Sequence, residues 1–568
     1  MCPTSDAAGR PLVYAGGDVL HVRRPRIGFR HSIVSRLTSW AAAVAAVVVL
    51  NLPLAMANRW PTPFPRLTGD LSAELAAVVL VLALASRAVP GPGVRTTRGL
   101  AVLWVLLTYG RYAAATAQSL WGRDINLYWD MPHLPAVGAM LAYVIDPRVV
   151  AGLLAGLLLV PLLLYVPYRW AFATVIEALR APGRRVVLAG AAAAVLVYGA
   201  GQRLDARVPQ RPAVVEPVTF VWARQARQYA IEASGAGLEA LGPAPVIDTT
   251  LDALGGADVF LVFVESYGAV SWDRPAFAAA LAPARARFAS DIRETGRDVV
   301  SAFVESPTFG GESWLAHLSL LSGTEVRDGA TNVRLLAQDR DTMVTAFARA
   351  GYRTIAIMPG LQQAWREGAF YGFDVVYDAP RLAYAGPPFG WWDVTDQFAL
   401  AKVDRLEVAG RHAPVFVVFP TISTHTPFTP TPPYQPDWAR VLTSSPYDAA
   451  ALDAAYGVPA DWLDLGPGFV QALGYDFQTL GGYLRLRADR DLVLIVLGDH
   501  QPPALVSGEG APWDVPVHVV ASRPALLDAL VARGFRRGLT PARPVLSKMH
   551  ALLPTLLDAF DGRPPSTR

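Results

Sequence analysis

The sequence contains a single cysteine, Cys2, among 568 residues. One thiol cannot form an internal disulfide, and a cysteine in the N-terminal tail offers no cysteine-based metal site or nucleophile. Charged residues are also scarce, at 17% compared with about 25% in soluble proteins. The formal net charge is only +3 and no basic block is present, which argues against nucleic acid as a partner. The chain is long enough for several domains, and we attribute its low charge to membrane segments.

Five apolar stretches in the first 200 residues approach the roughly 20 residues that are needed to cross a bilayer. They follow a basic tail, residues 1–36, which is not a cleavable signal peptide because the first apolar run is too long and others follow. A shorter run, 133–145, is interpreted as an interfacial or re-entrant helix or as a sixth span. The predicted transmembrane domain, 37–202, contains spans at about 37–57, 71–90, 99–119, 148–168 and 185–201.

Arginine distribution predicts the orientation of these spans, because basic loops stay on the cytoplasmic side. Arginines gather in the tail and in the 87–98 and 169–185 loops, whereas the 58–70 loop holds only two. The N-terminus is therefore predicted in the cytoplasm, and the chain after residue 202 on the extracytoplasmic (periplasmic) side of the cell membrane. Arg111 falls toward the outer end of the third span. A charge inside the membrane costs free energy, which either snorkelling to the interface or contact with a lipid headgroup would offset.

A connector, 203–250, contains an amphipathic run at 220–241 that is suited to the membrane surface. From residue 251 onward, short apolar strands alternate with helices, which predicts an α/β domain over 251–568. Helices are expected near 313–322, 341–350, 394–409 and 467–487. Strands are expected at 258–264, 298–304, 353–358, 414–420, 491–497 and 515–521.

Polar residues follow four of these strands directly. Glu265 follows the first, and a Gly-Gly-Glu-Ser313 bend follows the second. His425 comes after the fourth strand, and Asp499-His500 after the fifth. In open α/β sheets the ligand crevice lies beyond the carboxyl ends of the strands, so the four segments are expected to converge on one site.

Two carboxylates and an imidazole, from Glu265, Asp499 and His500, are a suitable ligand set for a divalent cation such as Mn²⁺ or Zn²⁺. If the Ser313 oxygen completes that set, metal coordination favours its alkoxide and makes it a nucleophile toward phosphorus. The alternative for Ser313 is an ordinary helix N-cap at a strand–helix turn. Asp499-His500 alone would also fit a simple turn. His317, one turn after Ser313, is left open between reaching the site and packing.

These residues carry a resemblance to the alkaline phosphatase/sulfatase superfamily, and the whole chain resembles its lipoteichoic acid synthase and membrane phosphoglycerol transferase branch. Val-Glu265-Ser and Gly498-Asp499-His500 are similar to the metal-ligand motifs of the family. Thr308-Phe-Gly-Gly-Glu-Ser313 resembles its nucleophile segment. The resemblance implies one bound metal, Mn²⁺ in preference to Zn²⁺ or Mg²⁺. It implies Ser313 as nucleophile and as a metal ligand beside Glu265, Asp499 and His500.

Substrate-contacting residues are implied by the same resemblance. His425 in Thr-His-Thr-Pro-Phe is similar to the histidine that contacts substrate, and Trp365-Arg366 resembles the segment that holds the headgroup phosphate. Three features depart from the family pattern. The nucleophile is Ser rather than Thr, Glu312 stands where a basic residue is common, and the gap between Arg366 and Gly372 is short.

The predicted function is a metal-dependent transferase that moves a phospho-headgroup, preferably phosphoglycerol, from a membrane phospholipid to a glycan or alcohol acceptor through a phosphoserine. A membrane-tethered phosphodiesterase or phosphatase, with water as acceptor, is the main alternative. Phosphoethanolamine transfer is disfavoured because the domain lacks the cysteines and additional histidines of that group. Sulfate hydrolysis is disfavoured because Ser313 is followed by neither Pro nor Arg. A non-catalytic membrane scaffold is ranked last.

Overall fold

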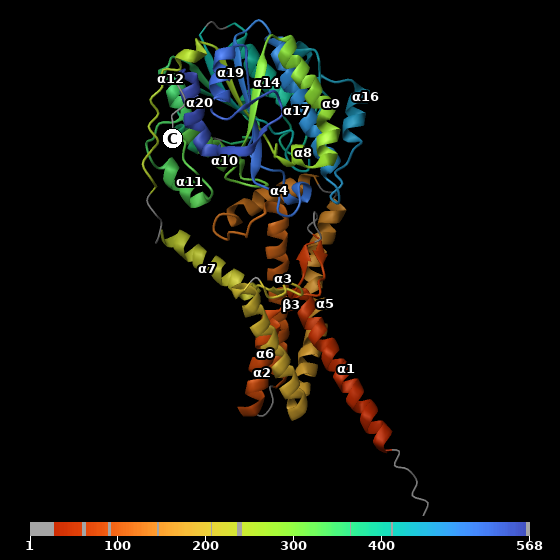
Figure 1. Cartoon of the computed structure of the whole chain (residues 1–568). Helices are drawn as coiled ribbons and strands as arrows, with labels where there is room; N and C mark the ends of the chain where they lie inside the picture. Colours follow the sequence, from red (N-terminus) through yellow and green to blue (C-terminus); the bar gives the residue numbers. More distant parts are fainter. Residues whose placement is uncertain are drawn as a thin grey trace, which may run out of the picture.

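The computed structural model describes residues 28–58, 64–88, 93–144, 147–205, 207–235, 241–363, 365–410 and 413–563. Long helices from the N-terminal part form a bundle beneath an α/β domain that is built from residues 251 onward (Figure 1). The connector between them contains helix α7 (Val218–Ser234).

All five predicted spans are helical. The bundle packs through buried side chains such as Trp104, Tyr168 and Phe172. Within the described residues, four helices are long and apolar enough to cross a membrane, namely α3, α5, α6 and the Leu37–Leu54 part of α1. Helix α2 has 16 residues, about 24 Å of helix, which is shorter than the ~30 Å apolar core of a bilayer. The bounds are α1 (Gly28–Leu54), α2 (Ala73–Ala88), α3 (Val94–Trp121), α5 (Pro147–Arg180) and α6 (Pro182–Leu204).

Helix α5 continues well past the predicted end of its span at residue 168. Its second half packs into the bundle through Phe172 and Ile176, whereas Leu158 and Leu163 in its first half are exposed. An apolar stretch that no protein surface covers is typical of a lipid-facing helix. The predicted interfacial run is helix α4 (Leu134–Val144), which lies at the base of the α/β domain (Figure 1).

The connector is tied back to the bundle through Asp70. Its carboxylate accepts hydrogen bonds from the Ala213 N–H at 2.9 Å and from Arg211 at 3.1 Å. Two-residue strands β3 (Leu71–Ser72) and β4 (Val214–Val215) pair beside this contact. A second short pair joins β1 (Ala57–Asn58) to β2 (Pro65–Arg66). Helix α7 begins close to the predicted amphipathic run, whose residues 236–240 lie outside the described part of the chain.

One nine-stranded sheet organises the α/β domain, in the order β12-β6-β11-β10-β5-β9-β7-β8, with β13 also paired to β6. All six predicted strands are present within about a residue of their expected bounds, while β8, β12 and β13 were not anticipated. The bounds are β5 (Asp258–Val264), β6 (Asp298–Glu305), β7 (Arg353–Met358), β8 (Val375–Asp378), β9 (Val415–Pro420), β10 (Leu492–Gly498), β11 (Asp514–Ala521), β12 (Arg536–Arg537) and β13 (Ala542–Lys548).

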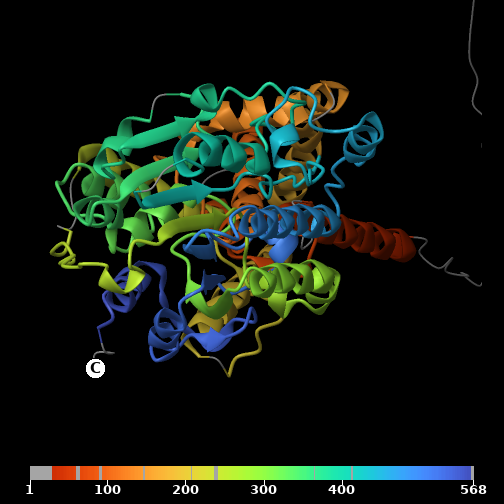
Figure 2. The ribbon, with the colours of Figure 1, turned by 90° about the horizontal axis from the view of Figure 1, so that it is seen from above.

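Helices cover both faces of this sheet (Figures 1 and 2), and the alternation within β5 shows why. Leu261 and Phe263 face one hydrophobic core, while Phe260 and Val262 face the other. A strand that is buried on both faces reads as an unbroken apolar run, as β5 does. One core contains α10 (Ser313–Ser322), α12 (Met343–Arg349), α19 (Pro524–Val531) and α20 (Leu552–Phe560). The other contains α9 (Pro275–Glu294), α14 (Asp396–Val403) and α17 (Gly466–Leu486).

Most strands are parallel, and this places the predicted site residues together. Strand β10 runs parallel to β5, and β5 runs parallel to β9. Strand β11 is antiparallel to both β10 and β6, which makes β6 parallel to the central strands. The connection from β10 to β11 contains only a four-residue helix, α18 (Ala504–Ser507), so the chain returns beside β10 in the opposite direction.

Candidate metal-dependent active site

The carboxyl ends of β5, β6 and β10 bring the four predicted metal ligands into one cluster. Glu265 follows β5, Ser313 begins helix α10 after β6, and Asp499 and His500 follow β10. One ligand atom from each of Glu265, Asp499 and His500 lies within 4.8 Å of the others. The Ser313 Oγ donates to Glu265 Oε2 at 2.9 Å and lies 3.1 Å from His500 Nε2.

The His500 ring is oriented with its lone pair toward this cluster. Its Nδ1 lies 2.7 Å from the Gln501 carbonyl oxygen, which can only accept a hydrogen bond. The proton therefore sits on Nδ1, and Nε2, at 3.4 Å from Glu265 Oε1, is left as an acceptor. A carbonyl that fixes the tautomer in this way is the usual support of a metal-binding histidine.

Asp499 supplies the strongest sign that a cation belongs here. Its Oδ1 accepts the backbone N–H groups of Ser266 and His500, at 2.8 and 2.7 Å. Its Oδ2 is buried and has no hydrogen-bond partner within the described part of the chain. Burial and the negative charge of Glu265 raise the pKa of Asp499 well above its usual range. A buried carboxylate oxygen without a partner, beside a second carboxylate and an imidazole, fits a divalent metal.

Glu265 responds differently to the same surroundings. Burial alone would raise its pKa, but the nearby His500 and His425 lower it below its ordinary value. Its carboxylate therefore stays ionised and accepts the hydrogen bond from the Ser313 hydroxyl. The two carboxyl groups have their pKa values pushed in opposite directions, a pattern that is common where catalysis occurs.

The helix-capping alternative for Ser313 is not what the structure shows. Glu312 occupies the N-cap position with φ of 60°, and its side chain makes no capping hydrogen bond. Ser313 is the first helical residue, and its hydroxyl contacts Glu265 and His500 instead of a backbone N–H. Gly310, at φ of 69°, is required by space as well, because a Cβ there would lie 2.6 Å from the Leu120 carbonyl oxygen.

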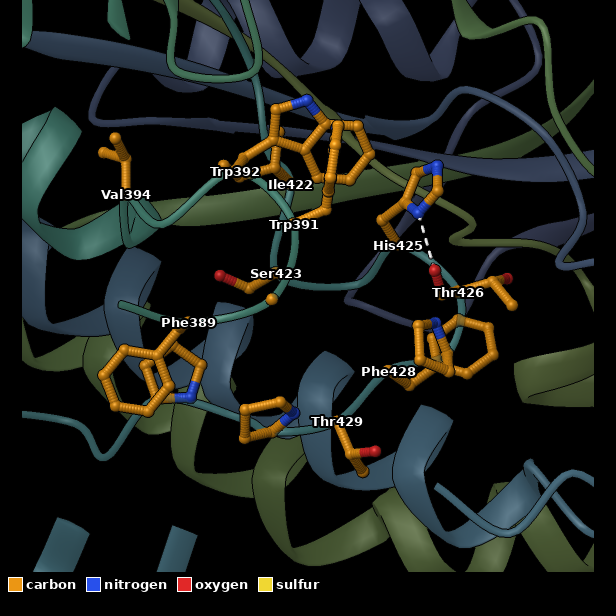
Figure 3. Close-up of a pocket in the computed structure, with 14 residues that line it drawn as sticks. Phe389, Trp391, Trp392, Val394, Ile422, Ser423, His425, Thr426, Phe428 and Thr429 are labelled. Atoms are coloured by element: carbon orange, nitrogen blue, oxygen red, sulfur yellow. Dashed lines mark hydrogen bonds between the residues drawn. The ribbon is translucent and has the colours of Figure 1, made fainter. Parts of the chain in front are cut away.

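His425 lies on the loop after β9, at the mouth of a small cavity of about 30 Å³ that Figure 3 shows. Its Nδ1 is 2.7 Å from the Thr426 carbonyl, so Nε2 is the nitrogen available to a substrate. Trp392 meets the imidazole edge to face at 4.3 Å between ring centroids, and Trp391 lines the same cavity. A carboxylate holds the loop, since Asp396 accepts from the N–H groups of Ile422 and Ser423 at 2.9 and 2.7 Å.

Asp396 has an equally buried carboxyl neighbour, Asp476, which accepts from the hydroxyl groups of Thr421 and Thr424 at 3.3 and 3.2 Å. Burial raises the pKa of Asp396 to about 6. Burial and the charge of Asp396 raise the pKa of Asp476 well above its ordinary value. The folded protein therefore holds protons that the unfolded chain releases near pH 4. This contribution to the free energy of unfolding is fully present below about pH 4 and is lost as pH rises through about 6.

Replacing Asp476 by asparagine should flatten this pH dependence. The substitution removes the carboxyl group whose pKa is raised well above its ordinary value by burial and by the charge of Asp396, so only Asp396 still contributes to the pH-linked loss of stability. Thermal unfolding between pH 4 and 7.5 measures the effect, with the surface substitution Asp437→Asn as control. If the melting temperature of Asp476→Asn declines with pH as steeply as that of the wild type, the pair does not hold a proton in the folded protein.

The two remaining predicted contacts are placed only in part. Trp365 packs on the hydrophobic core, with its ring 5.1 Å from that of Tyr371. The side chain of Arg366 lies outside the described part of the chain, and only its backbone, at the start of a 3₁₀ turn (Arg366–Phe370), is placed. His317 is partly buried, with its ring centroid 4.3 Å from that of Phe263, and desolvation lowers its pKa to about 3, so it is neutral. The roles of Trp365 and Arg366 stay predictions.

A group of residues from the helical part, missed by sequence reasoning, reaches the nucleophile segment. Arg123, two residues after α3, contacts Asp130 at 2.8 Å and Glu312 at 3.1 Å. His133 meets Trp314 at 5.5 Å between ring centroids. These contacts fall on both sides of Ser313. The one available signal was Glu312 itself, an acidic residue that the family pattern did not explain.

Arg123→Gln should therefore slow the reaction without removing the nucleophile. Glu312 has strained left-handed backbone, which persists only where surrounding contacts hold it. We expect kcat to fall about 10-fold with little change in KM, because a small displacement of a positioned group is costly. In a double-mutant cycle, Glu312→Gln should add little to Arg123→Gln. Arg180→Gln, which breaks an exposed pair with Glu177, is the control. Additive effects in the cycle would contradict this positioning role.

The fold and the site together define a class, an α/β domain joined to long apolar helices, with a serine hydroxyl beside a carboxylate–histidine cluster that could hold a metal ion. Residues 317–513 match the model of the sulfatase family. This match, over about a third of the chain, confirms the resemblance to the alkaline phosphatase/sulfatase superfamily. No curated protein matches this sequence.

Solved structures that this chain is similar to include two transferases and a synthase. The lipooligosaccharide phosphoethanolamine transferase A of Neisseria meningitidis is 14% identical, with 87% of this chain and 91% of that chain covered and a TM-score of 0.43. The lipoteichoic acid synthase LtaP of Listeria monocytogenes is 13% identical, covering 49% and 68%, with a TM-score of 0.32. The phosphoglycerol transferase GacH of Streptococcus pyogenes is 10% identical, covering 54% and 82%, with a TM-score of 0.32.

Proposed function

We propose that this protein transfers a phospho-headgroup, with phosphoglycerol preferred, from a membrane phospholipid to a glycan or alcohol on the extracytoplasmic side. The observation that carries the proposal is the position of Ser313. Its Oγ contacts both Glu265 and His500, beside the partnerless Asp499 Oδ2. A serine placed within a metal-ligand set is equipped for nucleophilic attack on a phosphate ester.

Glu265, Ser313, Asp499 and His500 would hold one divalent cation, Mn²⁺ in preference to Zn²⁺ or Mg²⁺. When bound, the cation lowers the pKa of the serine hydroxyl and neutralises charge on the phosphoryl oxygens. The chain's own contribution begins with proton transfer from Ser313 Oγ to Glu265 Oε2, along the hydrogen bond that Oγ already donates to Oε2 at 2.9 Å. The low pKa of Glu265 keeps its carboxylate ionised until that transfer.

In the first half-reaction an Oγ–P bond forms and the bond from phosphorus to the diacylglycerol oxygen breaks. The imidazolium form of His425 gives the leaving oxygen a proton from Nε2, while its Nδ1–H stays bonded to the Thr426 carbonyl. In the second half-reaction the acceptor hydroxyl gives its proton to His425 Nε2 and attacks phosphorus. The Oγ–P bond breaks, and Glu265 returns its proton to the Ser313 Oγ. Trp365 and Arg366 are proposed to hold the headgroup phosphate during both steps.

A membrane anchor suits a donor that never leaves the bilayer. In this proposal residues 37–202 are the transmembrane domain, 203–250 the connector and 251–568 the extracytoplasmic catalytic domain. Contacts of Arg123 and His133 with the nucleophile segment support a catalytic domain that rests on the bundle at its membrane-facing side. The donor ester bond would then reach Ser313 with its acyl chains still in lipid.

Product analysis tests the proposal against the hydrolytic alternative. Purified protein with Mn²⁺ is incubated with phosphatidylglycerol or phosphatidylethanolamine, with and without a glycan acceptor. Transfer predicts diacylglycerol from one donor and a headgroup-modified glycan in equal amount. Free glycerol phosphate or phosphoethanolamine, unchanged in yield by the acceptor, would identify a hydrolase. No diacylglycerol from any donor would refute both enzymatic readings.

A further inference from the structure

A second, larger cavity of about 480 Å³ lies between helix α3 and the α/β domain. Its wall on the bundle side is formed by α3, where Ala114 and Ala115 leave room beside Arg111. Its opposite wall comes from two segments that also build the active site. Phe309 belongs to the nucleophile segment, and Ala504 follows His500 closely in the chain.

Arg111 is the cation inside this cavity. Its Nε donates to the Met56 carbonyl oxygen at 2.9 Å, which fixes the direction of the guanidinium. Across the described residues, its two Nη groups have no hydrogen-bond partner, and no carboxylate forms an ion pair with them. Other arginines around the cavity differ, since Arg123 and Arg224 are both paired with carboxylates.

The depth of Arg111 makes this arrangement costly without a ligand. It lies ten residues before the end of α3 at Trp121, about 15 Å along the axis. It lies about 20 Å from Arg98, near the other end of the helix. Arginine at such a depth in a membrane helix normally faces a polar cavity or a partner, and is a sign of a functional site.

The acidic residues that line the cavity are Asp124, Glu216 and Glu509. Glu216 and Asp124 both contact Arg224, at 2.5 and 3.6 Å, so their charge is compensated. Glu509 is exposed on the 508–513 loop and makes no ion pair within the described part of the chain. A ligand that fills the cavity would meet a cation on the membrane helix and a carboxylate and the Gln118 amide toward the α/β domain.

We propose that this cavity binds the headgroup of a membrane phospholipid, with its phosphate at Arg111 and its hydroxyl or ammonium donors at Glu509 and Gln118. The proposal rests on the function proposed above, for which it supplies a holding site for the donor lipid. Arginine recognises phosphate oxygens with paired N–H groups, and a carboxylate accepts from hydroxyl or ammonium groups equally. Because Phe309 is shared with the nucleophile segment, a lipid held here lies next to the loop that carries Ser313.

Lipid binding without turnover tests the site. Full-length Ser313→Ala protein is placed in detergent with phosphatidylglycerol, phosphatidylethanolamine, phosphatidylcholine or phosphatidic acid, and bound lipid is counted by native mass spectrometry. We expect Arg111→Met in this background to weaken binding of the donor-bearing lipids about 10-fold or more. Arg111→Lys should weaken binding to an intermediate extent, because lysine keeps the positive charge but lacks the paired N–H groups of the guanidinium. Arg98→Met, on the same helix, should leave binding unchanged.

The four lipids separate headgroup recognition from nonspecific lipid contact. Phosphatidylglycerol and phosphatidylethanolamine, whose headgroups carry hydrogen-bond donors, should bind more tightly than phosphatidylcholine and phosphatidic acid. The lipid that binds more tightly of these two is identified as the substrate that supplies the headgroup. Exposed Glu509→Gln, which should not affect folding, is expected to reduce that preference. Equal binding of all four lipids, or unchanged binding in Arg111→Met, would overturn the proposal.

Turnover of a soluble substrate distinguishes failure of the proposed lipid site from failure of the proposed enzymatic function. With Ser313 intact, Arg111→Met should cleave a water-soluble phosphodiester such as bis-p-nitrophenyl phosphate at the wild-type rate, because Arg111 is not among the metal ligands. Loss of lipid binding with retained soluble turnover supports the site. Absence of soluble turnover and of diacylglycerol release in the wild type would count against the enzyme, whatever the lipid-binding result.

Discussion

Ser313→Ala is expected to reduce diacylglycerol release by about 10³-fold or more, because the Ser313 Oγ is the hydroxyl that contacts both Glu265 and His500 and forms the proposed ester with phosphorus. The loss should appear in kcat, since Ser313 acts on the reacting phosphorus and the other groups that hold lipid are intact. Rates are measured with the phospholipid that the wild type prefers, at saturating Mn²⁺.

Two controls test whether the loss of activity in Ser313→Ala comes from the missing hydroxyl and not from misfolding. The melting temperature should change little, because the Ser313 hydroxyl is bonded only to groups that a cation would also satisfy. Ser290→Ala, an exposed serine bonded to Glu294 at 2.8 Å, serves as the matched substitution and should keep wild-type activity. Ser313→Ala protein with full activity would exclude the covalent mechanism.

Asp499→Asn is expected to remove the bound metal together with at least about 10²-fold of the activity. The asparagine oxygen can still accept from the Ser266 and His500 N–H groups, so the local backbone should hold. What disappears is the negative charge that the cation requires. Metal content per chain, by elemental analysis after dialysis against Mn²⁺ or Zn²⁺, measures the first effect directly.

Thermal unfolding with and without metal gives an independent readout for Asp499→Asn. The metal-free variant should be more stable than metal-free wild type, because it relieves buried repulsion with Glu265, the same repulsion that raises the pKa of Asp499. The rise in melting temperature on adding metal, seen in wild type, should vanish. Asp558→Asn, at an exposed pair with Arg563, is the control. A metal-induced rise that persists in Asp499→Asn would remove this residue from the ligand set.

The central strands could be predicted from the sequence because each is an unbroken apolar run that ends in polar residues. Burial on both faces leaves no room for polar positions inside β5 or β10, so their ends are sharp. The same feature located Glu265 and Asp499-His500, which follow those strands without an intervening loop. Parallel pairing then brought them together, as the sheet register shows.

Other parts of the molecule depend on information that a local pattern does not carry. Helix α9 was missed because Pro283 interrupts an alanine- and arginine-rich segment whose apolar stripe is weak. The antiparallel direction of β11 is set by a connection that lacks a crossover helix. The contact of Arg123 with Glu312 joins the helical part to the α/β domain, and neither residue lies in a sequence motif that predicts contact with the other.

The most direct test of the central claim is mass spectrometry of the peptide that contains Ser313 after brief incubation of the protein with donor phospholipid and Mn²⁺. The account predicts that this peptide gains the mass of the phospho-headgroup, that the gain maps to Ser313, and that adding the acceptor removes it. Diacylglycerol release with no adduct on Ser313, or with an adduct on another residue, would contradict the account.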